Sequence, residues 1–317
     1  MFTALSLLLV GLLLLAYAAD QFVIGAGRLS RILGVPPVVV GVVIVGFGTS
    51  LPELLVSGLG AAGGEADAAF GNAMGSNIAN LTLILGTGAL IHPLAVSSRI
   101  LRREIPLSLV AMALAAVGAL LGGPRLAGVA LLVSGVAFIV ATLRASGGEP
   151  ADALGADTDD LLQPETHTTR AEGIRTALGL IGTVAGAQML LTGALALAEM
   201  AGLSGGAVGA TIVAVGTSLP ELVTVVQAAR RNEPDLVLGN LWGSNLFNSL
   251  IVTGVSFTVS TTALTTGLAL TGAVGIMVGA GVLAALLVRS NRTLTRVEGA
   301  VLLLVYAASL PVLLATG

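Results

Sequence analysis

The sequence predicts an all-α polytopic membrane protein, with ten transmembrane helices arranged as two inverted five-helix repeats. Three observations lead to this fold class: an apolar composition, an uneven distribution of arginines and a long internal repeat. Of the 317 residues, 55% are hydrophobic and only 10% are charged, whereas soluble domains carry roughly 25% charged residues. The mean hydropathy of +1.00 agrees with this deficit, so we expect a lipid bilayer to surround the chain.

Ten apolar stretches are long enough to span a bilayer, which requires about 20 predominantly apolar residues. Charge clusters and Gly/Pro turns separate them. The first stretch has no preceding Lys or Arg, so we interpret it as a transmembrane helix and not as a signal peptide. The expected spans lie near residues 2–24, 35–60, 68–92, 104–121, 126–144, 172–199, 206–229, 235–260, 264–288 and 297–316.

The arginines predict the orientation of these spans. All 14 basic residues are arginines, and 13 of them lie in or beside the loops after spans 1, 3, 5, 7 and 9. Only Arg125 lies in a loop on the other side. The positive-inside rule therefore places these odd-numbered loops in the cytoplasm and both termini outside the plasma membrane. At this interface, we expect Glu104 to pair with its neighbour Arg103.

An internal repeat divides the chain into two units. Residues 46–54 read GFGTSLPEL and residues 214–222 read AVGTSLPEL, and the same offset of 168 pairs the GN..GSN..N pattern at 71–80 with that at 239–248. Because each unit contains five spans, the two units should have opposite orientations in the membrane. The expected parts are a first five-helix repeat (1–145, with its motif at 46–80), a cytoplasmic acidic linker (146–171) and a second five-helix inverted repeat (172–317, with its motif at 214–248).

Each GTSLPEL copy should break its helix inside the membrane. Pro52 and Pro220 lack an N–H group and collide with the carbonyl four residues earlier. The freed carbonyls need another partner in hydrocarbon, and a bound cation is one. Glu53 and Glu221 follow at mid-span, where a charged group costs at least ~2.5–3.5 kcal/mol. Two such carboxylates at matching positions indicate an ion site; the competing interpretation is a pair of protonated structural acids.

The second motif adds hydroxyl and amide oxygens. Ser76 and Asn80 are four residues apart and share a helix face, as do Ser244 and Asn248. All these potential ligands carry oxygen, and the chain has no cysteine, so the site favours Ca²⁺, Na⁺ or Mg²⁺ over Zn²⁺ or Cu⁺. Four more amides could bind ions or join helices, since small residues flank them: Asn72, Asn77, Asn240 and Asn245.

Other classes of protein fit the sequence less well. The net charge of −3 and the lack of a basic block argue against nucleic-acid binding. An enzyme is not expected, because neither His92 nor His167 lies in a repeat motif and no span contains paired aspartates. A channel would need a continuous pore, whereas inverted repeats around one central site favour a carrier.

These motifs resemble the two α-repeats of the cation/calcium exchanger superfamily, specifically its prokaryotic sodium/calcium exchangers. The resemblance covers essentially the whole chain and implies electrogenic exchange of Na⁺ for Ca²⁺ by alternating access, with spans 1 and 6 sliding along the core. It implies no cofactor beyond the transported ions, and a monomer is the expected functional unit. It also implies the following ion ligands, to which the carbonyls of Gly46 and Ala214 are added: Thr49, Ser50, Glu53, Ser76, Asn80, Thr217, Ser218, Glu221, Ser244 and Asn248.

One position departs from the pattern of the family. Many prokaryotic members, and the potassium-dependent branch, carry Asp where this chain has Asn248, so the site has two carboxylates and not three. This difference favours independence from potassium. Proton-coupled relatives usually carry Asn-x-x-Glu-like variants in place of Ser-Leu-Pro-Glu, which favours sodium coupling here. A proton/divalent-cation antiporter that uses the same glutamates is the alternative.

Overall fold

The computed structural model of the chain describes residues 1–35, 37–145, 168–200 and 214–316. These residues are almost entirely helical, and the strands among them are β1 (Leu94–Ala95) and β2 (Thr293–Leu294), which pair in antiparallel fashion. The predicted all-α class is confirmed for this part of the chain. Most of the predicted acidic linker, and the beginning of the span predicted near 206–229, lie outside the described residues.

The helices of the two halves share several boundaries. In the second half, α12, α13, η6 and α14 have the bounds of α4, α5, η2 and α6 shifted by 168 residues. The helices of the first half, in which η marks a π-helical turn, are α1 (Phe2–Leu33), α2 (Pro37–Val40), η1 (Gly41–Gly46), α3 (Phe47–Thr49), α4 (Leu51–Ala62), α5 (Ala66–Ala79), η2 (Asn80–Ile84), α6 (Leu85–Ile91), η3 (Ile100–Glu104), α7 (Ile105–Leu120) and α8 (Arg125–Ala145). Those of the second half are α9 (Thr169–Met200), α11 (Ala214–Thr217), α12 (Leu219–Arg230), α13 (Pro234–Phe247), η6 (Asn248–Val252), α14 (Thr253–Val259), α15 (Leu268–Asn291) and α16 (Arg296–Thr316).

Several of these helices are long and apolar enough to cross a membrane. The bent pair Pro37–Thr49 and Leu51–Ala62 passes the same criterion if it is counted as one span. The described residues therefore form a multi-span membrane protein, but length and apolarity identify fewer spans than the ten expected. In part this is because α12 has only 12 residues and amide and hydroxyl side chains interrupt 234–259. The six spans found among the described residues are Phe2–Leu33, Ala66–Ile91, Ile100–Leu120, Arg125–Thr142, Thr169–Ala194 and Leu270–Arg289.

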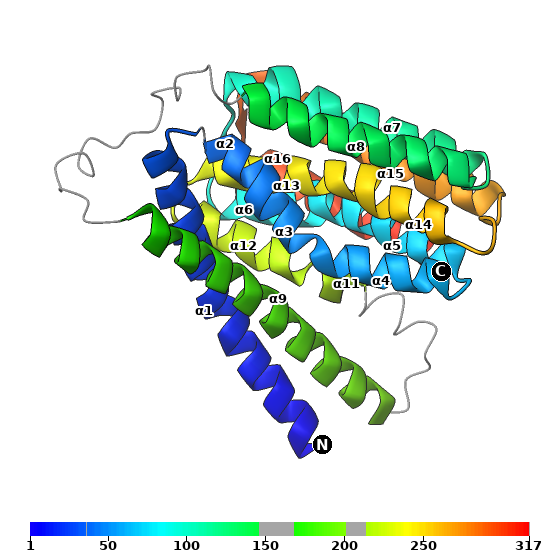
Figure 1. Cartoon of the computed structure of the whole chain (residues 1–317), viewed down its shortest axis with the longest axis horizontal. Helices are drawn as coiled ribbons and strands as arrows, with labels where there is room; N and C mark the ends of the chain where they lie inside the picture. The colour runs from blue at the N-terminus through cyan, green and yellow to red at the C-terminus, as the bar shows by residue number, and fades with distance from the viewer. Residues whose placement is uncertain (36, 146–167, 201–213, 317) are drawn as a thin grey trace.

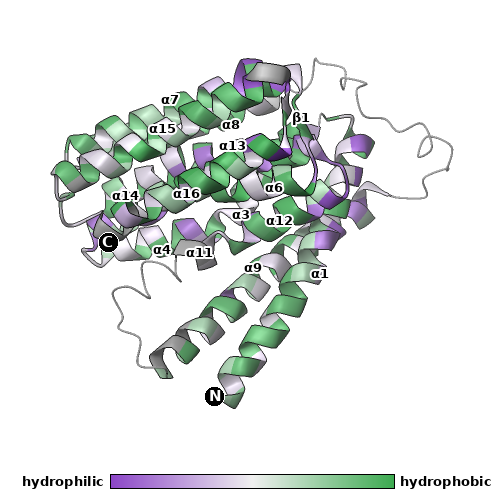
Figure 2. Ribbon diagram, turned by 180° about the vertical axis from the view of Figure 1, so that it is seen from behind, coloured by the Kyte–Doolittle hydropathy of each residue, from purple (hydrophilic) through white to green (hydrophobic). Residues whose placement is uncertain are grey.

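Helices α1 and α9 form a pair that projects from the rest of the bundle (Figure 1). Glycines permit their close approach: a Cβ atom on Gly25 would lie 2.6 Å from Thr176 Oγ1, and one on Gly186 would lie 2.6 Å from Leu15 N. Both helices are mostly hydrophobic along their projecting parts (Figure 2). This surface suits contact with lipid, and the tight seam makes the two helices one unit.

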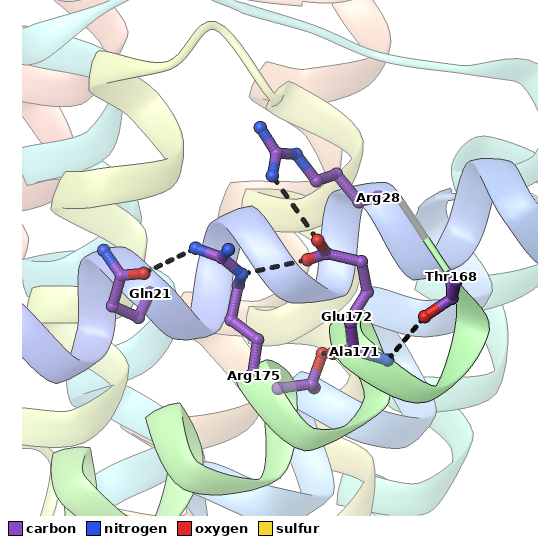
Figure 3. Close-up of polar contacts among 7 residues, drawn as sticks. Gln21, Arg28, Thr168, Ala171, Glu172 and Arg175 are labelled. Atoms are coloured by element: carbon purple, nitrogen blue, oxygen red, sulfur yellow. Dashed lines mark hydrogen bonds and ion pairs between the residues drawn. The ribbon is translucent and has the colours of Figure 1, made fainter. Parts of the chain in front are cut away.

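An ion-pair cluster joins α1 and α9 where the pair meets the bundle (Figure 3). The side chain of Glu172 is only 1% exposed, and its Oε1 lies 3.4 Å from Arg28 Nη1 while its Oε2 lies 3.0 Å from Arg175 Nε. Arg175 Nη1 also donates to Gln21 Oε1 at 2.7 Å. Because removing one partner of a buried ion pair is strongly destabilising, this cluster should fix the register of α1 against α9.

Helix α13 lies at the centre of the bundle, against the π-helical turn η1. Every residue from Leu236 to Phe247 is buried. A Cβ atom on Gly46 would lie 2.8 Å from Asn240 O, and Val42 O would lie 2.7 Å from a Cβ atom on Gly243. This close approach brings the first GTSLPEL motif against the second GN..GSN..N motif.

The predicted pairing of Glu104 with Arg103 is wrong. Glu104 Oε1 lies 3.4 Å from Arg99 Nε, and both side chains are largely buried. Arg103 donates instead from Nη2 to Ala141 O at 3.1 Å. The reason is the π-helical turn η3, because a π-helical turn brings residues five apart onto the same face.

Candidate ion-binding site

Both GTSLPEL motifs break their helices, as their prolines predict. The segments before and after Ser50 bend by 43°, and Ser50 (φ −85°, ψ 9°) and Ser218 (φ −87°, ψ 7°) both leave helical geometry. Proline then stands in the first turn of the next helix, where its missing N–H costs nothing. Glu53 and Glu221 consequently lie in the first turns of α4 and α12, where the helix dipole favours a negative charge.

The Glu53 carboxyl group is fully buried and receives hydroxyl groups from both halves of the chain. Ser76, from α5, donates to its Oε1 at 3.4 Å, and Ser218, from the break before α12, donates to the same oxygen at 3.2 Å. Ser218 and Ser76 are also 3.2 Å apart. The other oxygen, Oε2, is buried without a hydrogen-bond partner among the described residues. One oxygen is therefore held in place while the other stays available.

The Glu221 carboxyl group repeats this arrangement with the halves exchanged. Ser50, from the first half, donates to its Oε1 at 2.9 Å, and Ser244 Oγ, from α13, lies 3.5 Å from the same oxygen. Its Oε2 is also buried and has no partner within the described part of the chain. Each carboxylate thus lies beside one hydroxyl from its own half and one from the other, so the halves meet at this point.

The two threonines also contact amides of the opposite half. Thr49 Oγ1 lies 3.3 Å from Asn240 Oδ1 and donates to Val45 O at 3.0 Å, while Thr217 Oγ1 lies 3.4 Å from Asn72 Oδ1. Asn72 in turn donates from Nδ2 to Ser57 Oγ at 3.0 Å. Thr49 and Thr217 were among the predicted ligands, whereas Ser57 was not.

Gly46 and Ala214 are the two residues whose carbonyls were predicted as ligands. The Gly46 carbonyl accepts from Ser244 Oγ at 2.9 Å and lies 3.4 Å from Thr49 Oγ1. The carbonyl is therefore directed at the serine that lies beside Glu221. Ala214 begins α11, directly after the residues 201–213 that are not described.

The amides of the second motif form a chain across the two halves. Asn80 Nδ2 donates to Asn245 Oδ1 at 2.9 Å, and Asn245 Nδ2 donates to Asn77 O at 3.2 Å. Asn77 Nδ2 donates to Ser249 Oγ at 2.9 Å. Asn248 is fully buried, and neither atom of its amide has a partner among the described residues. Sequence reasoning left the role of Asn245 open and missed Ser249, which has no polar counterpart in the first half.

The arrangement suits a hard cation. Two carboxylates supply the negative charge, and hydroxyl, amide and carbonyl groups supply neutral oxygens, which is the ligand chemistry of Ca²⁺ and Na⁺. The described residues contain no group of three or more His, Cys, Asp or Glu side chains that could hold a metal ion, so any cation here must rely on those neutral oxygens. Buried carboxylate oxygens without partners are costly, and a bound cation or proton would remove this cost.

Comparisons with known proteins agree with this chemistry. The family model described as "Sodium/calcium exchanger protein" matches residues 3–144 and 174–315. The chain is 37% identical over 312 residues to the putative antiporter CaxA of Alkalimonas amylolytica, covering 96% of this chain and 97% of that protein. It is 29% identical to the sodium/calcium exchanger MaX1 of Methanosarcina acetivorans, with 97% of each chain covered.

Solved structures give a similar result. A structure of the sodium-calcium exchanger NCX_Mj soaked with Na⁺ and Sr²⁺ has a TM-score of 0.86 and 29% sequence identity, with 98% of each chain covered. A structure of the same exchanger soaked with Na⁺ and 0.1 mM Ca²⁺ has a TM-score of 0.85 and covers 97% of each chain. The similarity therefore extends over the whole bundle as well as over the two motifs.

Proposed function

The chain belongs to the sodium/calcium exchanger protein family, and from this premise we propose that it exchanges Na⁺ for Ca²⁺ across the membrane by alternating access. The observation that carries the proposal is the pair of buried carboxyl groups, Glu53 and Glu221. Each is fixed through one oxygen by serines from both halves and has a second oxygen without a partner among the described residues. Two carboxylates neutralise one Ca²⁺, and the same charges can instead be neutralised by Na⁺ ions.

The proposed ion site extends from these carboxylates to the neighbouring neutral oxygens. Ser50, Ser76, Ser218 and Ser244 support it because they contact the carboxylates directly. Asn80 and Asn248 support it because each has a buried amide oxygen without a partner in the described part of the chain. The full proposed set of ligands is Thr49, Ser50, Glu53, Ser76, Asn80, Thr217, Ser218, Glu221, Ser244 and Asn248, with the carbonyls of Gly46 and Ala214.

The topology we propose has ten spans, in two inverted five-helix repeats at 1–145 and 172–317. It is supported by the four helices that share boundaries at an offset of 168, and by the family model, which matches a segment in each half. The arginine distribution supports a cytoplasmic linker at 146–171 and external termini in the plasma membrane. Since the two halves enclose the site within one chain, we propose a monomer as the functional unit.

The exchange in this account moves more than two Na⁺ ions for each Ca²⁺, which makes it electrogenic, and it is independent of potassium. Moving more than two Na⁺ ions against one Ca²⁺ transfers net charge, and a voltage of 100 mV then contributes about 2.3 kcal/mol per elementary charge moved. Asn248 leaves the site with two carboxylates, so a third monovalent cation must bind to neutral oxygens. This chemistry gives no strong additional site for K⁺.

The moving element in this account is the pair α1 and α9. Its glycine seam and the Glu172 cluster hold the two helices together, while much of their length projects away from the bundle (Figure 1). A pair of cysteines introduced to crosslink α9 to α12 should stop exchange and leave calcium binding intact. Exchange that continues after complete crosslinking would exclude this movement.

Uptake of radioactive calcium into proteoliposomes loaded with Na⁺, in Na⁺-free buffer, tests the proposed function. The wild-type protein should accumulate calcium only when the Na⁺ gradient is present, and Glu53→Gln and Glu221→Gln should each abolish the uptake. Uptake that requires an outward proton gradient and ignores Na⁺ would identify the proton/divalent-cation antiporter instead. Calcium flux without counterflow would indicate a channel.

A further inference from the structure

The orientation of the Asn245 side chain is fixed by a group that can only accept a hydrogen bond. Its amide lies 3.2 Å from the backbone carbonyl oxygen of Asn77. A carbonyl oxygen has no hydrogen to donate, so the atom of Asn245 that faces it must be Nδ2. The carbonyl oxygen of the Asn245 side chain, Oδ1, must then face the other way, toward Asn80.

This orientation determines that of Asn80 in turn. Asn245 Oδ1 is 2.9 Å from the amide of Asn80, and an acceptor at that distance requires Asn80 to present Nδ2. The oxygen of Asn80, Oδ1, is therefore turned away from Asn245, and it is buried without a partner among the described residues. Asn80 lies one turn after Ser76, which contacts Glu53, so Asn80 shares the helix face that carries the ion site.

The second half lacks an equivalent pair of hydrogen bonds to orient the amide of Asn248. The counterpart of Asn245 is Asn77, whose Nδ2 is drawn toward Ser249 Oγ at 2.9 Å and Met277 Sδ at 3.6 Å. The position equivalent to Ser249 in the first half is Leu81, which offers no polar group. Asn248, the counterpart of Asn80, consequently has no partner for either amide atom within the described residues. No hydrogen bond within the described residues fixes which way its amide faces.

We propose that Asn245 is a positioning residue that keeps the side-chain oxygen of Asn80 directed at the bound cation, whereas Asn248 is an adjustable ligand. This inference rests on the proposed ion site. An amide rotated by half a turn presents N–H groups where a cation needs an oxygen, and this replaces an attractive dipole with a repulsive one. The backbone carbonyl of Asn77 prevents that rotation through Asn245. The asymmetry leaves one amide of fixed orientation and one that can adapt to ions of different size and charge.

The test is equilibrium binding of radioactive calcium to the purified full-length protein, combined with a rescue experiment. Asn245→Leu keeps the number and branching of the side-chain heavy atoms but can neither accept from Asn80 nor donate to Asn77, so we expect calcium affinity to fall at least tenfold. Asn80→Asp presents an oxygen in either orientation and does not need Asn245. In the Asn80→Asp background, adding Asn245→Leu should therefore cost at most twofold, and it can improve binding because it removes an oxygen that faces the new carboxylate.

A purely structural role for Asn245 gives a different pattern. In that case Asn245→Leu would cost the same factor in both backgrounds, and this result would overturn the proposal. Asn77→Leu is the matched comparison: it removes an equally buried amide at the equivalent position but leaves the Asn77 carbonyl in place, so its cost should stay under threefold. A loss as large as that of Asn245→Leu would also overturn the proposal.

Failure of the inference and failure of the proposed function can be told apart. Wild-type protein that shows no sodium-dependent calcium uptake would contradict the proposed function itself. Wild-type protein that exchanges normally, together with an Asn245→Leu variant that binds calcium as tightly as wild type, would contradict only the positioning role. Elution as a single species on size exclusion confirms that each variant is folded before binding is measured.

Discussion

The two halves of the molecule place the same serines around their glutamates, but they give their asparagines different hydrogen-bond partners. Around Glu53 and Glu221, the same two serines recur at an offset of 168, and each glutamate takes one hydroxyl from the opposite half. The symmetry between the halves does not extend to the partners of the asparagines. Ser57 holds Asn72 in the first half, whereas Val225 stands at the equivalent position and leaves Asn240 Nδ2 without a partner in the described structure.

This difference separates two tasks of the site. Charge must be neutralised equally whichever half a cation approaches, so a symmetric pair of carboxylates suits a carrier that opens to both sides. The orientation of neutral oxygens distinguishes one cation from another, and here the halves differ. A duplicated chain can keep charge neutralisation symmetric between its halves. Differences such as Leu81 in the first half and Ser249 at the equivalent position of the second half can then make the orientation of the neutral oxygens asymmetric.

The largest expected effect tests the symmetric shell. Glu53→Gln and Glu221→Gln should each lower calcium affinity at least 100-fold and to a similar extent. A unit charge 4 Å from a cation contributes about 4 kcal/mol at an effective dielectric constant of about 20, and about 1.4 kcal/mol corresponds to tenfold. Titration calorimetry on both variants measures the effect. A loss in only one variant would show that the halves do not share the charge.

Glu233→Gln is the control for that measurement. Its carboxyl pairs with Arg31 at 3.6 Å, and both side chains are partly exposed. Exposed ion pairs contribute about 0.2–1 kcal/mol, so calcium affinity should change less than fivefold.

The second prediction concerns the exchange of hydroxyls between the halves. Ser50→Ala and Ser218→Ala should each weaken calcium binding roughly 10- to 100-fold, because a hydrogen bond to a charged group contributes about 1.5–3 kcal/mol. Ser50 contacts Glu221, so a double-mutant cycle should show coupling between Ser50→Ala and Glu221→Gln. The cycle of Ser50→Ala with Glu53→Gln should be nearer to additive. Coupling confined to residues of one half would contradict the crossed arrangement.

The third prediction removes the hydrogen bond that distinguishes Asn72 from its counterpart Asn240. Ser57→Val places in the first half the residue that the second half already carries. Asn72 then loses its acceptor, and we expect the free energy of unfolding to fall by about 1 kcal/mol, with a smaller effect on transport. Thermal unfolding in detergent measures the change. Thr87→Val, which removes a part-buried hydroxyl bonded only to its own helix, is the control and should cost less.

The smallest expected effect concerns the connection of α1 to α12. Asp20 and Arg231 form an ion pair at side-chain exposures of 29% and 40%. At the offset of 168, Asp20 corresponds to Gln188 and Arg231 corresponds to Gly63, so the repeat does not reproduce this ion pair. Asp20→Asn should therefore alter the ratio of forward to reverse exchange by up to about fivefold, since an exposed pair contributes about 0.2–1 kcal/mol. Uptake measured in both directions tests this. Equal changes in both directions would show that the pair does not bias one state.

Local chemistry predicted the features that depend on single residues. The breaks at Ser50 and Ser218 follow from proline, and the meeting of the two motifs follows from the repeat. The sequence did not predict which serine serves which glutamate, because that depends on contacts between residues more than 140 positions apart. The π-helical turns that begin at Asn80 and Asn248 carry no local signal, and a similar turn displaced the predicted partner of Glu104 from Arg103 to Arg99.

The four asparagines whose role the sequence left open show the same limit of prediction from sequence. Asn72, Asn77, Asn240 and Asn245 look equivalent in the sequence, yet the structure gives them four different environments. The differences come from residues that the repeat comparison did not single out, such as Ser57 and Ser249. Amide orientation is set by the nearest acceptor in space, and no periodicity in the chain encodes that neighbour.

The central claim is that Na⁺ and Ca²⁺ compete for one site between the two glutamates. Displacement of bound radioactive calcium from the purified protein by increasing Na⁺, at constant ionic strength, tests it most directly. We predict complete displacement, with a dependence on Na⁺ steeper than first order because more than one Na⁺ replaces each Ca²⁺. Calcium that stays bound at saturating Na⁺, or displacement that is unchanged in Glu53→Gln and Glu221→Gln, would contradict the account.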